Sequence, residues 1–232
     1  MLAYVSKLDF LLWVALPYAV ITIFILGHIY RYLTDGFSWT SKSSELLEKN
    51  MLRIGSMAFH YGILMVLIGH FIGLIIPKSW HEAFGLNDHL YHLIAVVGGL
   101  LSGLFALFGL IVLTYRRFSV KRVLAASSLG DKVVLGVLLL VVILGLLATL
   151  SNIGGQFDYR TTIAPWLRGI LTLRPDPTLM QDVPVLFKLH ILAVMLLLAI
   201  WPFTRLVHVL SVPIAFIWRT PIIFRQRCPE RD

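Results

Sequence analysis

Five long runs of apolar residues limit what this chain can fold into. They cover residues 10–30, 54–76, 91–114, 133–150 and 186–204. Each has about 18–25 residues, close to the roughly 20 that a helix needs to cross a hydrocarbon layer about 30 Å thick. Backbone N–H and C=O groups in lipid must be bonded within the segment, which makes such runs helices. Transmembrane strands would show about ten residues of alternating polarity instead, a pattern that this sequence lacks.

The composition agrees with an integral membrane protein. Of the 232 residues, 58% are hydrophobic and 14% are charged, which lies outside the range of soluble globular domains. The first run is too long for the apolar core of a signal peptide, contains Pro17 and lacks a small-residue cleavage site, so we expect it to be a retained span. We predict an all-α membrane protein, with residues 1–232 forming a single antiparallel bundle of five transmembrane helices.

The basic residues predict how this bundle is oriented. Of the 20 Lys and Arg residues, 14 lie in the segments 31–53, 115–132 and 205–231. Short cytoplasmic loops carry an excess of Lys and Arg, so these segments, including a tail over 205–232, are expected in the cytoplasm. With five spans the N-terminus then lies outside, and the protein is a multi-pass protein of the cytoplasmic membrane. The net charge of +8 mostly reflects this topology, and nucleic acid is not needed to explain it.

Four histidines lie on two of the predicted spans. His60 and His70 are on the second span, and His190 and His208 are on the fifth. A lone buried histidine is more often a hydrogen-bonded structural residue, but ionisable groups at membrane depth are functional candidates, and four on two helices favour binding. Because the two helices run in opposite directions, we expect His70 opposite His190 toward the outside and His60 opposite His208 toward the cytoplasm.

The spacing along the chain predicts two separate sites. At a rise of about 1.5 Å per residue, the depths of His60 and His70 differ by about 15 Å, and those of His190 and His208 by about 27 Å. We expect tilt and a disruption at Pro202 to absorb this mismatch and to leave the sites roughly 20 Å apart. At about 100° per residue, His190 and His208 share one face of their helix.

Two facing imidazoles at each of two depths suit haem iron better than zinc. Zinc needs a third or fourth protein ligand, and no Cys, Asp or Glu lies at these levels. Haem iron takes four nitrogens from its porphyrin and needs only two axial ligands. We therefore predict two haems whose closed axial positions suit electron transfer. The only cysteine, Cys228, cannot hold an iron–sulfur cluster, so any cluster belongs to a partner.

Small and basic residues near these histidines are compatible with haem binding, but helix packing and membrane orientation also account for them. Four glycines would let a flat macrocycle approach the backbone, although helix packing alone also favours them. The propionates need cations at the membrane edge, and Arg205, Arg116 or Arg117 lie at suitable positions, although the orientation rule alone would place them there. The glycines are Gly55, Gly62, Gly69 and Gly73.

Three stretches of the sequence resemble one known family. They are "FSWTSKSSELLEKN" (37–50), "FHYGILMVLIGHFIGLIIP" (59–77) and "FKLHILAVMLLLAIWPFTRLVHVLSVP" (187–213). Together they are similar to the gamma subunit of respiratory nitrate reductase, a membrane cytochrome b with two haems. The resemblance covers essentially the full chain, and the four histidines keep the order and spacing of that family.

The resemblance implies a route for electrons. Quinol (menaquinol or ubiquinol) would be oxidised near an outer haem held by His70 and His190. Electrons would pass through an inner haem held by His60 and His208 to a cytoplasmic iron–sulfur subunit, and then to a molybdenum subunit that reduces nitrate. Quinol protons would leave on the outer side, and the inner ends of the helices, with the tail from about 205 to 232, would dock the iron–sulfur subunit.

The quinol site departs from the family pattern. Some members have a Lys at the outer start of the third helix, where an alignment without gaps places Leu90 in this sequence. His89 and His92 lie beside it at a spacing of three residues, and either histidine could accept the quinol proton. The alternative is that both are interfacial residues facing water. We expect His28 and His81 to be surface residues.

The long outer loop is interfacial in character. Trp166 and Tyr159 suit the headgroup region, and a short amphipathic helix is expected near 165–173. The loop is equally well explained as a lid without chemistry.

Two rival functions remain open. A close one is the homologous diheme subunit of another quinone-linked reductase, of the heterodisulfide or sulfite type, which differs from the first in its partner subunits. A haem-free membrane anchor or a transporter with histidine proton relays belongs to a different class, which the absence of a haem spectrum would reveal.

Overall fold

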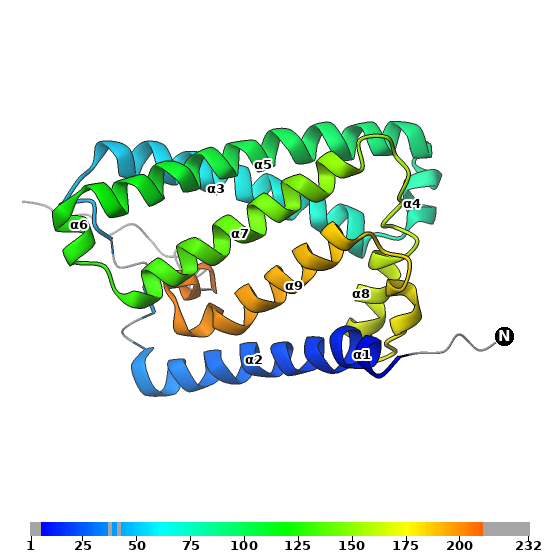
Figure 1. Cartoon of the computed structure of the whole chain (residues 1–232), viewed down its shortest axis with the longest axis horizontal. Coiled ribbons are helices and arrows are strands. Elements are labelled where there is room, and N and C mark those ends of the chain that lie inside the picture. Colours follow the sequence, from blue (N-terminus) through cyan, green and yellow to red (C-terminus); the bar gives the residue numbers. More distant parts are fainter. Residues whose placement is uncertain (1–5, 37–38, 41–42, 211–232) are drawn as a thin grey trace, which may run out of the picture.

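The computed structural model describes residues 6–36, 39–40 and 43–210 as an elongated bundle of long helices (Figure 1). Five helices in the described residues are long and apolar enough to cross a membrane, which confirms the five predicted spans. Each helix either extends beyond its predicted apolar run at both ends or has ends within a few residues of the ends of that run. The five are Lys7–Asp35, Asn50–Ile75, Asp88–Ser119, Leu129–Ser151 and Val185–Phe203.

The first two spans each contain a wider turn. The first consists of α1 (Lys7–Phe10), a π-helical turn (Leu11–Ala15) and α2 (Leu16–Asp35). Pro17 has no N–H to donate to the preceding turn, which is a local reason for the irregularity. The second span is α3 (Asn50–His70), which continues through a π-helical turn over Phe71–Ile75.

Two of the later helices begin at recognisable caps. The Asn87 side chain accepts a hydrogen bond from the Leu90 N–H at the start of α5, and Ser128 and Asp131 form a capping box at the start of α7. In Figure 1, α4 and α8 lie at one end of the bundle and α6 at the other, and we call these the α8 end and the α6 end. The elements are α4 (Lys78–Ala83), α5 (Asp88–Ser119), α6 (Lys121–Ala125), α7 (Leu129–Ser151), α8 (Ile163–Leu171) and α9 (Val185–Ile200).

Helices α3 and α5 pack side by side with their backbones in contact (Figure 1). A Cβ added at Gly62 would lie 2.4 Å from the Ala106 backbone nitrogen, and one at Gly109 would lie 2.3 Å from the Phe59 backbone nitrogen. Helices in lipid associate through close packing at small residues. Gly62 is therefore explained by helix packing, and so is Gly55, which packs against Leu113.

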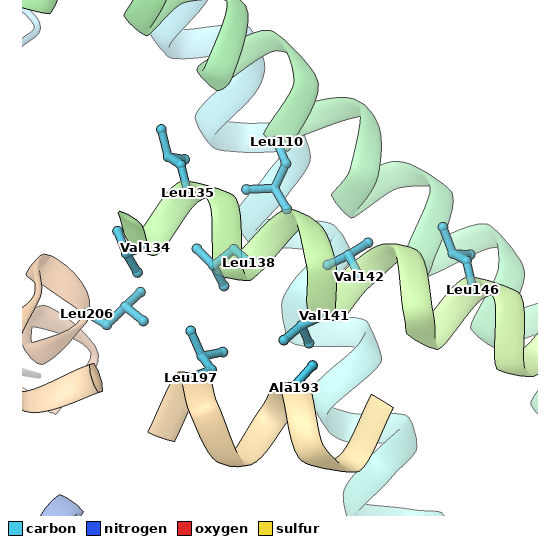
Figure 2. Close-up of a cluster of buried hydrophobic side chains, with 10 residues drawn as sticks. All are labelled: Leu110, Val134, Leu135, Leu138, Val141, Val142, Leu146, Ala193, Leu197 and Leu206. Atoms are coloured by element: carbon cyan, nitrogen blue, oxygen red, sulfur yellow. The ribbon is translucent and has the colours of Figure 1, made fainter. Parts of the chain in front are cut away.

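The apolar core lies where α7 packs between α5 and α9 (Figure 2). Leu110 of α5 and Val134 of α7 are almost completely buried in it, and Leu206 joins it from beyond α9. The outward faces also carry large apolar side chains, including Leu101 and Phe105 of α5, which are 66% and 50% exposed. An apolar surface of this kind is suited to contact with lipid.

The fifth span breaks before it reaches His208, so the prediction that His190 and His208 share a helical face is wrong. Helix α9 ends at Ile200 and is followed by a short 3₁₀ turn, η5 (Trp201–Phe203). Thr204 is extended, and a second 3₁₀ segment, η6 (Arg205–Leu210), then carries His208. Pro202 inside this break removes a donor that a continuous helix would need. The expected disruption at Pro202 is thus present, but it ends the helix.

Helix α8 matches the amphipathic helix expected near 165–173, but its aromatic residue does not lie at a lipid surface. Trp166 is 3% exposed, packs edge-on against Trp13 and donates from Nε1 to the Trp13 carbonyl at 2.8 Å. The headgroup position expected for Trp166 is therefore wrong, because α8 folds back onto the first span.

Candidate functional site

The rings of His70 and His190 face each other near the α8 end. His70 is the last residue of α3, and His190 lies in the first half of α9. Their ring centroids are 6.1 Å apart and the ring planes differ by 38°. The sequence predicted this pair, because antiparallel helices bring these two residues to the same level of the bundle.

Both rings of this pair are fixed by backbone carbonyls. His70 donates from Nδ1 to the Val66 carbonyl on its own helix at 2.8 Å, and His190 donates from Nδ1 to the Val141 carbonyl of α7 at 3.0 Å. Gly145 makes the second contact possible, since a Cβ there would lie 2.9 Å from His190 Cε1. A proton held on Nδ1 leaves the lone pair on Nε2, the nitrogen that a metal binds.

His60 and His208 form a similar pair toward the α6 end. Their ring centroids are 6.3 Å apart, with the planes 61° apart. His60 donates from Nδ1 to the Ser56 carbonyl at 2.7 Å, and His208 donates from Nδ1 to the carbonyl of Arg205. In both pairs, therefore, every Nδ1 atom is engaged with a backbone carbonyl.

The segment that carries His208 is held by side chains from distant elements. Arg31 of α2 donates from Nη1 to the carbonyls of Pro202 and Thr204, at 2.7 and 2.8 Å. Trp39 donates from Nε1 to the Val207 carbonyl at 2.6 Å. These bonds satisfy carbonyls that a continuous helix would have bonded internally.

A cavity of about 580 Å³ opens beside the His70–His190 pair. Its volume lies within the roughly 300–1,000 Å³ typical of small-molecule and cofactor sites. Gly69 lines it, and a Cβ there would meet nothing within 4 Å, so of the four glycines Gly69 is the one that leaves open space. Tyr91, Tyr159 and Trp166 also line the cavity.

The metal-binding groups that the described residues bring together at the pairs are imidazoles. In the part of the chain that the structure describes, no three His, Cys, Asp or Glu side chains gather closely enough to hold a metal ion. Two imidazoles alone fall short of the four ligands of a structural zinc site. They equal the two axial ligands of a haem iron.

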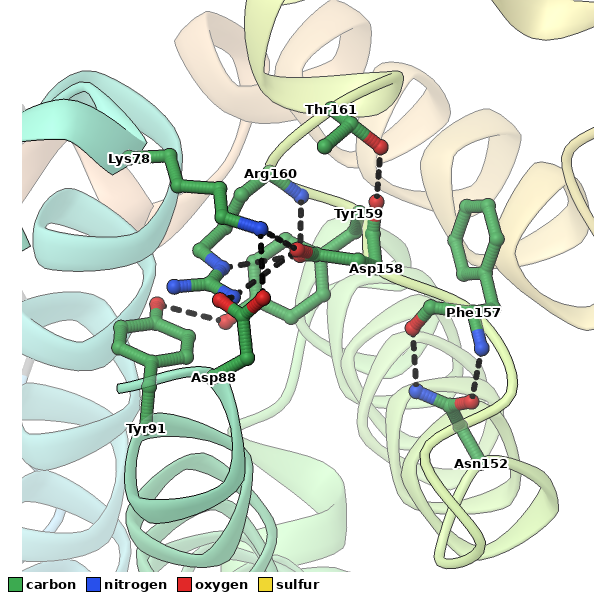
Figure 3. A network of polar contacts seen from close by, with 9 residues as sticks. All are labelled: Lys78, Asp88, Tyr91, Asn152, Phe157, Asp158, Tyr159, Arg160 and Thr161. Carbon is green, nitrogen blue, oxygen red and sulfur yellow. Dashed lines mark hydrogen bonds and ion pairs between the residues drawn. The ribbon is translucent and has the colours of Figure 1, made fainter. Parts of the chain in front are cut away.

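A polar network lies at the α8 end, next to the cavity-lining residues Tyr91 and Tyr159 (Figure 3). Lys78 forms ion pairs with Asp88 at 2.9 Å and with Asp158 at 3.2 Å, and Arg160 pairs with the same two carboxylates. The hydrogen bond to Asp88 raises the pKa of Lys78. Burial opposes ionisation of Asp158, but hydrogen bonds from Arg160 hold its pKa below the ordinary value.

A pair of tyrosine hydroxyls joins this network to the cavity. The hydroxyl oxygens of Tyr91 and Tyr159 are 2.9 Å apart, and the Arg160 guanidinium lies 3.9 Å from the centre of the Tyr91 ring. Burial raises the pKa of Tyr159 far above its usual value, so its hydroxyl stays protonated. Gly73 leaves room for the pair, since a Cβ there would be 2.8 Å from the Tyr159 hydroxyl. Tyr159 thus directs its hydroxyl into the protein, and its expected position at the depth of the headgroups stays a prediction.

The remaining histidines fall into different surroundings. His92 lines the cavity and donates from Nε2 to the Ile153 carbonyl at 3.0 Å, whereas His89 is exposed and is not among the cavity-lining residues. His28 and His81 are 8% and 4% exposed, so the expectation that they are surface residues is wrong. His28 donates a hydrogen bond to the Phe24 carbonyl, and the His81 ring packs against the Tyr91 ring at an angle of 39°.

The three arginines expected at propionates also differ. Arg117 is 8% exposed, donates to the Ser127 hydroxyl at 2.7 Å and pairs with Asp131 at 3.5 Å. Arg116 is 2% exposed, and its three side-chain nitrogens donate to Glu48 and Ser44. A propionate role does not fit Arg116, because its side-chain donors already bind Ser44 and Glu48, in the loop between the first two spans.

Arg205 is about a quarter exposed and donates from Nε to Asp131 at 2.7 Å. Among the described residues, its two terminal nitrogens have no acceptor and could bind one from a ligand.

Sequence reasoning missed the residues that support the histidines from other helices. Gly145 is one of several glycines in an apolar span, and no local pattern distinguishes Tyr91 from the other aromatic residues of its span. The polar run Asp158–Arg160 in an otherwise interfacial loop was the one available signal, since charges in a buried loop need partners.

Comparisons with known proteins agree on one family. A family model described as nitrate reductase gamma subunit matches residues 9–227. The chain is 48% identical over 218 residues to the nitrate reductase gamma chain of Bacillus subtilis strain 168, which covers 94% of this chain and 98% of that protein. It is 34% identical over 217 residues to the respiratory nitrate reductase 2 gamma chain of Escherichia coli K12, covering 91% of this chain and 94% of that one.

A third relative places a similar sequence inside a longer protein. The nitrate reductase-like protein NarX of Mycobacterium tuberculosis H37Rv is 43% identical over 220 residues. The match covers 94% of this chain but 34% of that protein.

Proposed function

Since the chain belongs to the nitrate reductase gamma subunit family, we propose that its two histidine pairs bind two b-type haems that carry electrons from quinol toward nitrate reduction. The chain is a multi-pass membrane subunit of a respiratory nitrate reductase, which is an oxidoreductase. The haems, the quinol site, the orientation and the partner subunits are the parts that we propose.

The observation that carries the haem proposal is the arrangement of the four imidazoles. A metal–imidazole bond is about 2 Å long, so two imidazoles on opposite sides of one ion have ring centroids about 6 Å apart. The measured 6.1 and 6.3 Å fit this spacing. In each ring the Nδ1 proton is directed at a carbonyl, so Nε2 would be the ligand atom.

The surroundings of the His70–His190 pair fit a large flat group. The cavity beside the pair is lined mainly by apolar side chains, and Gly69 leaves its wall open. At the other pair, Arg205 is placed to pair with a propionate, while its Nε is held by Asp131. Arg116 does not share this role, because Glu48 and Ser44 already bind it.

When bound, the haem irons would supply reversible one-electron carriers on the two sides of the bilayer. The chain's own residues would hold, orient and shield them. His70 and His190 would hold one haem, His60 and His208 would hold the other, and the apolar helices would exclude water. His92, on the cavity wall, is the residue that we propose for the hydrogen bond to quinol, and the protonated hydroxyl of Tyr159 supplies a second polar group there.

We further propose that the α8 end faces outward and the α6 end faces the cytoplasm. Lys and Arg residues are concentrated in the loops of the α6 end, which agrees with the positive-inside rule. An iron–sulfur subunit, followed by a molybdenum subunit, would then dock at the α6 end. The tail proposed to take part begins at Arg205, but 205–210 is packed against the bundle, and 211–232, with Cys228, lies outside the described residues.

A spectrum tests this function directly. Membranes that contain the intact complex are expected to show a reduced-minus-oxidised spectrum of low-spin b haem, with two haems for each copy of the chain. Quinol should reduce both haems, and nitrate should reoxidise them. Reduction by quinol with reoxidation by another acceptor alone would favour a homologous quinone-linked reductase. A preparation without haem would leave a haem-free anchor or a proton-relay transporter.

A further inference from the structure

The position of His208 depends on contacts with other elements more than on its own segment. His208 lies on η6, a short 3₁₀ segment that follows the extended residue Thr204. The other three histidines of the pairs stand on long α-helices, whose own hydrogen bonds fix their course. A short 3₁₀ segment has poorer hydrogen-bond geometry and needs outside support.

Asp131 supplies such support from α7. Its Oδ1 accepts a hydrogen bond from Arg205 Nε at 2.7 Å, and the residue is 8% exposed. The carboxylate itself is held in place, because Oδ2 accepts from the Ser128 N–H at 3.0 Å and pairs with Arg117 at 3.5 Å. Asp131 is therefore a fixed anchor at the first turn of a long helix.

Arg205 passes this anchorage to the imidazole. Its side chain is bound to Asp131, and its carbonyl accepts the hydrogen bond from His208 Nδ1. Movement of Arg205 would move the acceptor that orients the ring. Leu206 and Val207, which lie between Arg205 and His208 in the sequence, are buried and keep the segment packed against the bundle.

We propose that Asp131 is a positioning residue for His208 and sets the angle of its ring at the His60–His208 site. This inference rests on the proposed binding of haem by that pair. Outer partners of metal-ligating histidines fix ring orientation, and their loss typically weakens metal binding about 10–100-fold. Asp131 would act in this way through Arg205, without touching the haem iron.

Two substitutions separate position from charge. D131N is nearly isosteric and removes the charge, whereas D131E keeps the charge and moves the carboxylate by one methylene. Both are made in the intact complex in membranes. The matched control is S128A, which removes half of the capping box at Asp131 and leaves the pair with Arg205 untouched.

The readouts are a redox titration of the two haems and the EPR spectrum of the low-spin ferric haems, which depends on the angle between the axial imidazole planes. We expect both Asp131 variants to change the EPR signal of the His60–His208 haem, and D131N to weaken retention of that haem about 10–100-fold. The signal of the other haem and the S128A spectrum should remain as in the wild type.

Three results would overturn the inference. In the first, the D131N potential shifts while both EPR signals stay unchanged, which would show an effect of charge alone. In the second, both haems are lost equally, which would show a general folding role. In the third, D131E retains the wild-type EPR signal while D131N does not accumulate. Failure of the proposed function is separate, because wild-type membranes would then contain no haem.

Discussion

The imidazole rings of His70 and His190 lie 6.1 Å apart between centroids, although 120 positions separate them in the chain. One ring is oriented by a carbonyl of its own helix and the other by the Val141 carbonyl of a third helix, α7. Three spans therefore cooperate in one site, and α7 also supports the His60–His208 pair, through Asp131.

Each histidine pair should be needed for one haem. H70A or H190A is expected to remove the haem near the α8 end, because one imidazole cannot fill both axial positions. H60A or H208A should remove the other haem and leave the first in part of the population. Haem content and the reduced-minus-oxidised spectrum of membranes measure this. Loss of a single haem on combining H70A with H208A would contradict the pairing.

The approach of His190 to α7 should depend on the absence of a side chain at position 145. In G145A the new Cβ would lie 2.9 Å from His190 Cε1, so the ring must move away from the Val141 carbonyl. We expect a changed low-spin spectrum of that haem and slower reduction by quinol. G136A on the same helix is the control, since a Cβ there meets nothing within 4 Å. Equal spectra for the two variants would contradict the role of Gly145.

The contact between α3 and α5 should tolerate no side chain at Gly62. A Cβ would lie 2.4 Å from the Ala106 backbone nitrogen, and backbone cannot rotate away as a side chain can. We expect G62A to destabilise the bundle by about 1–3 kcal/mol, the usual cost of overpacking. Thermal unfolding in detergent measures the effect, with G136A as the open-glycine control. A melting temperature for G62A at or above that of G136A would refute the close packing.

Stability of the α8 end should fall in acid. The folded-state pKa of Asp158 lies below its unfolded value, so its contribution is complete above the unfolded pKa, about 4, and is lost as the pH falls through the folded value. Lys78 has a raised pKa, so its contribution is complete below about 10 and is lost as the pH rises through the folded value.

The substitution D158N tests how stability depends on pH in the acid range. At pH 7 it should lower the melting temperature, because Arg160 and Lys78 lose a charged partner. The difference from the wild type should begin to shrink as the pH falls below about 4, the unfolded pKa, and should disappear as the pH passes through the lower folded-state pKa, where the wild-type carboxylate also becomes neutral. A difference that is independent of pH would show that the loss is steric.

His92 and His89 should differ in their effect on quinol oxidation. H92A is expected to raise the KM for quinol and to slow haem reduction, because His92 lines the cavity. H89A should leave both near the wild-type values, because His89 is exposed and outside the cavity lining. Stopped-flow reduction of the haems by quinol measures this. The opposite ranking of the two variants would move the quinol site out of the cavity.

The sequence alone determined the five spans, the membrane location and which histidines lie at the same level. These features follow from local quantities: the length of an apolar run, the rise per residue and the alternating direction of successive helices. The tertiary structure decided what holds the rings. Gly145 matters because the His190 ring of α9 lies close to it. Arg116 forms an ion pair with Glu48, and His81 is buried beside Tyr91. Such contacts join residues far apart in the chain, and no local pattern specifies them.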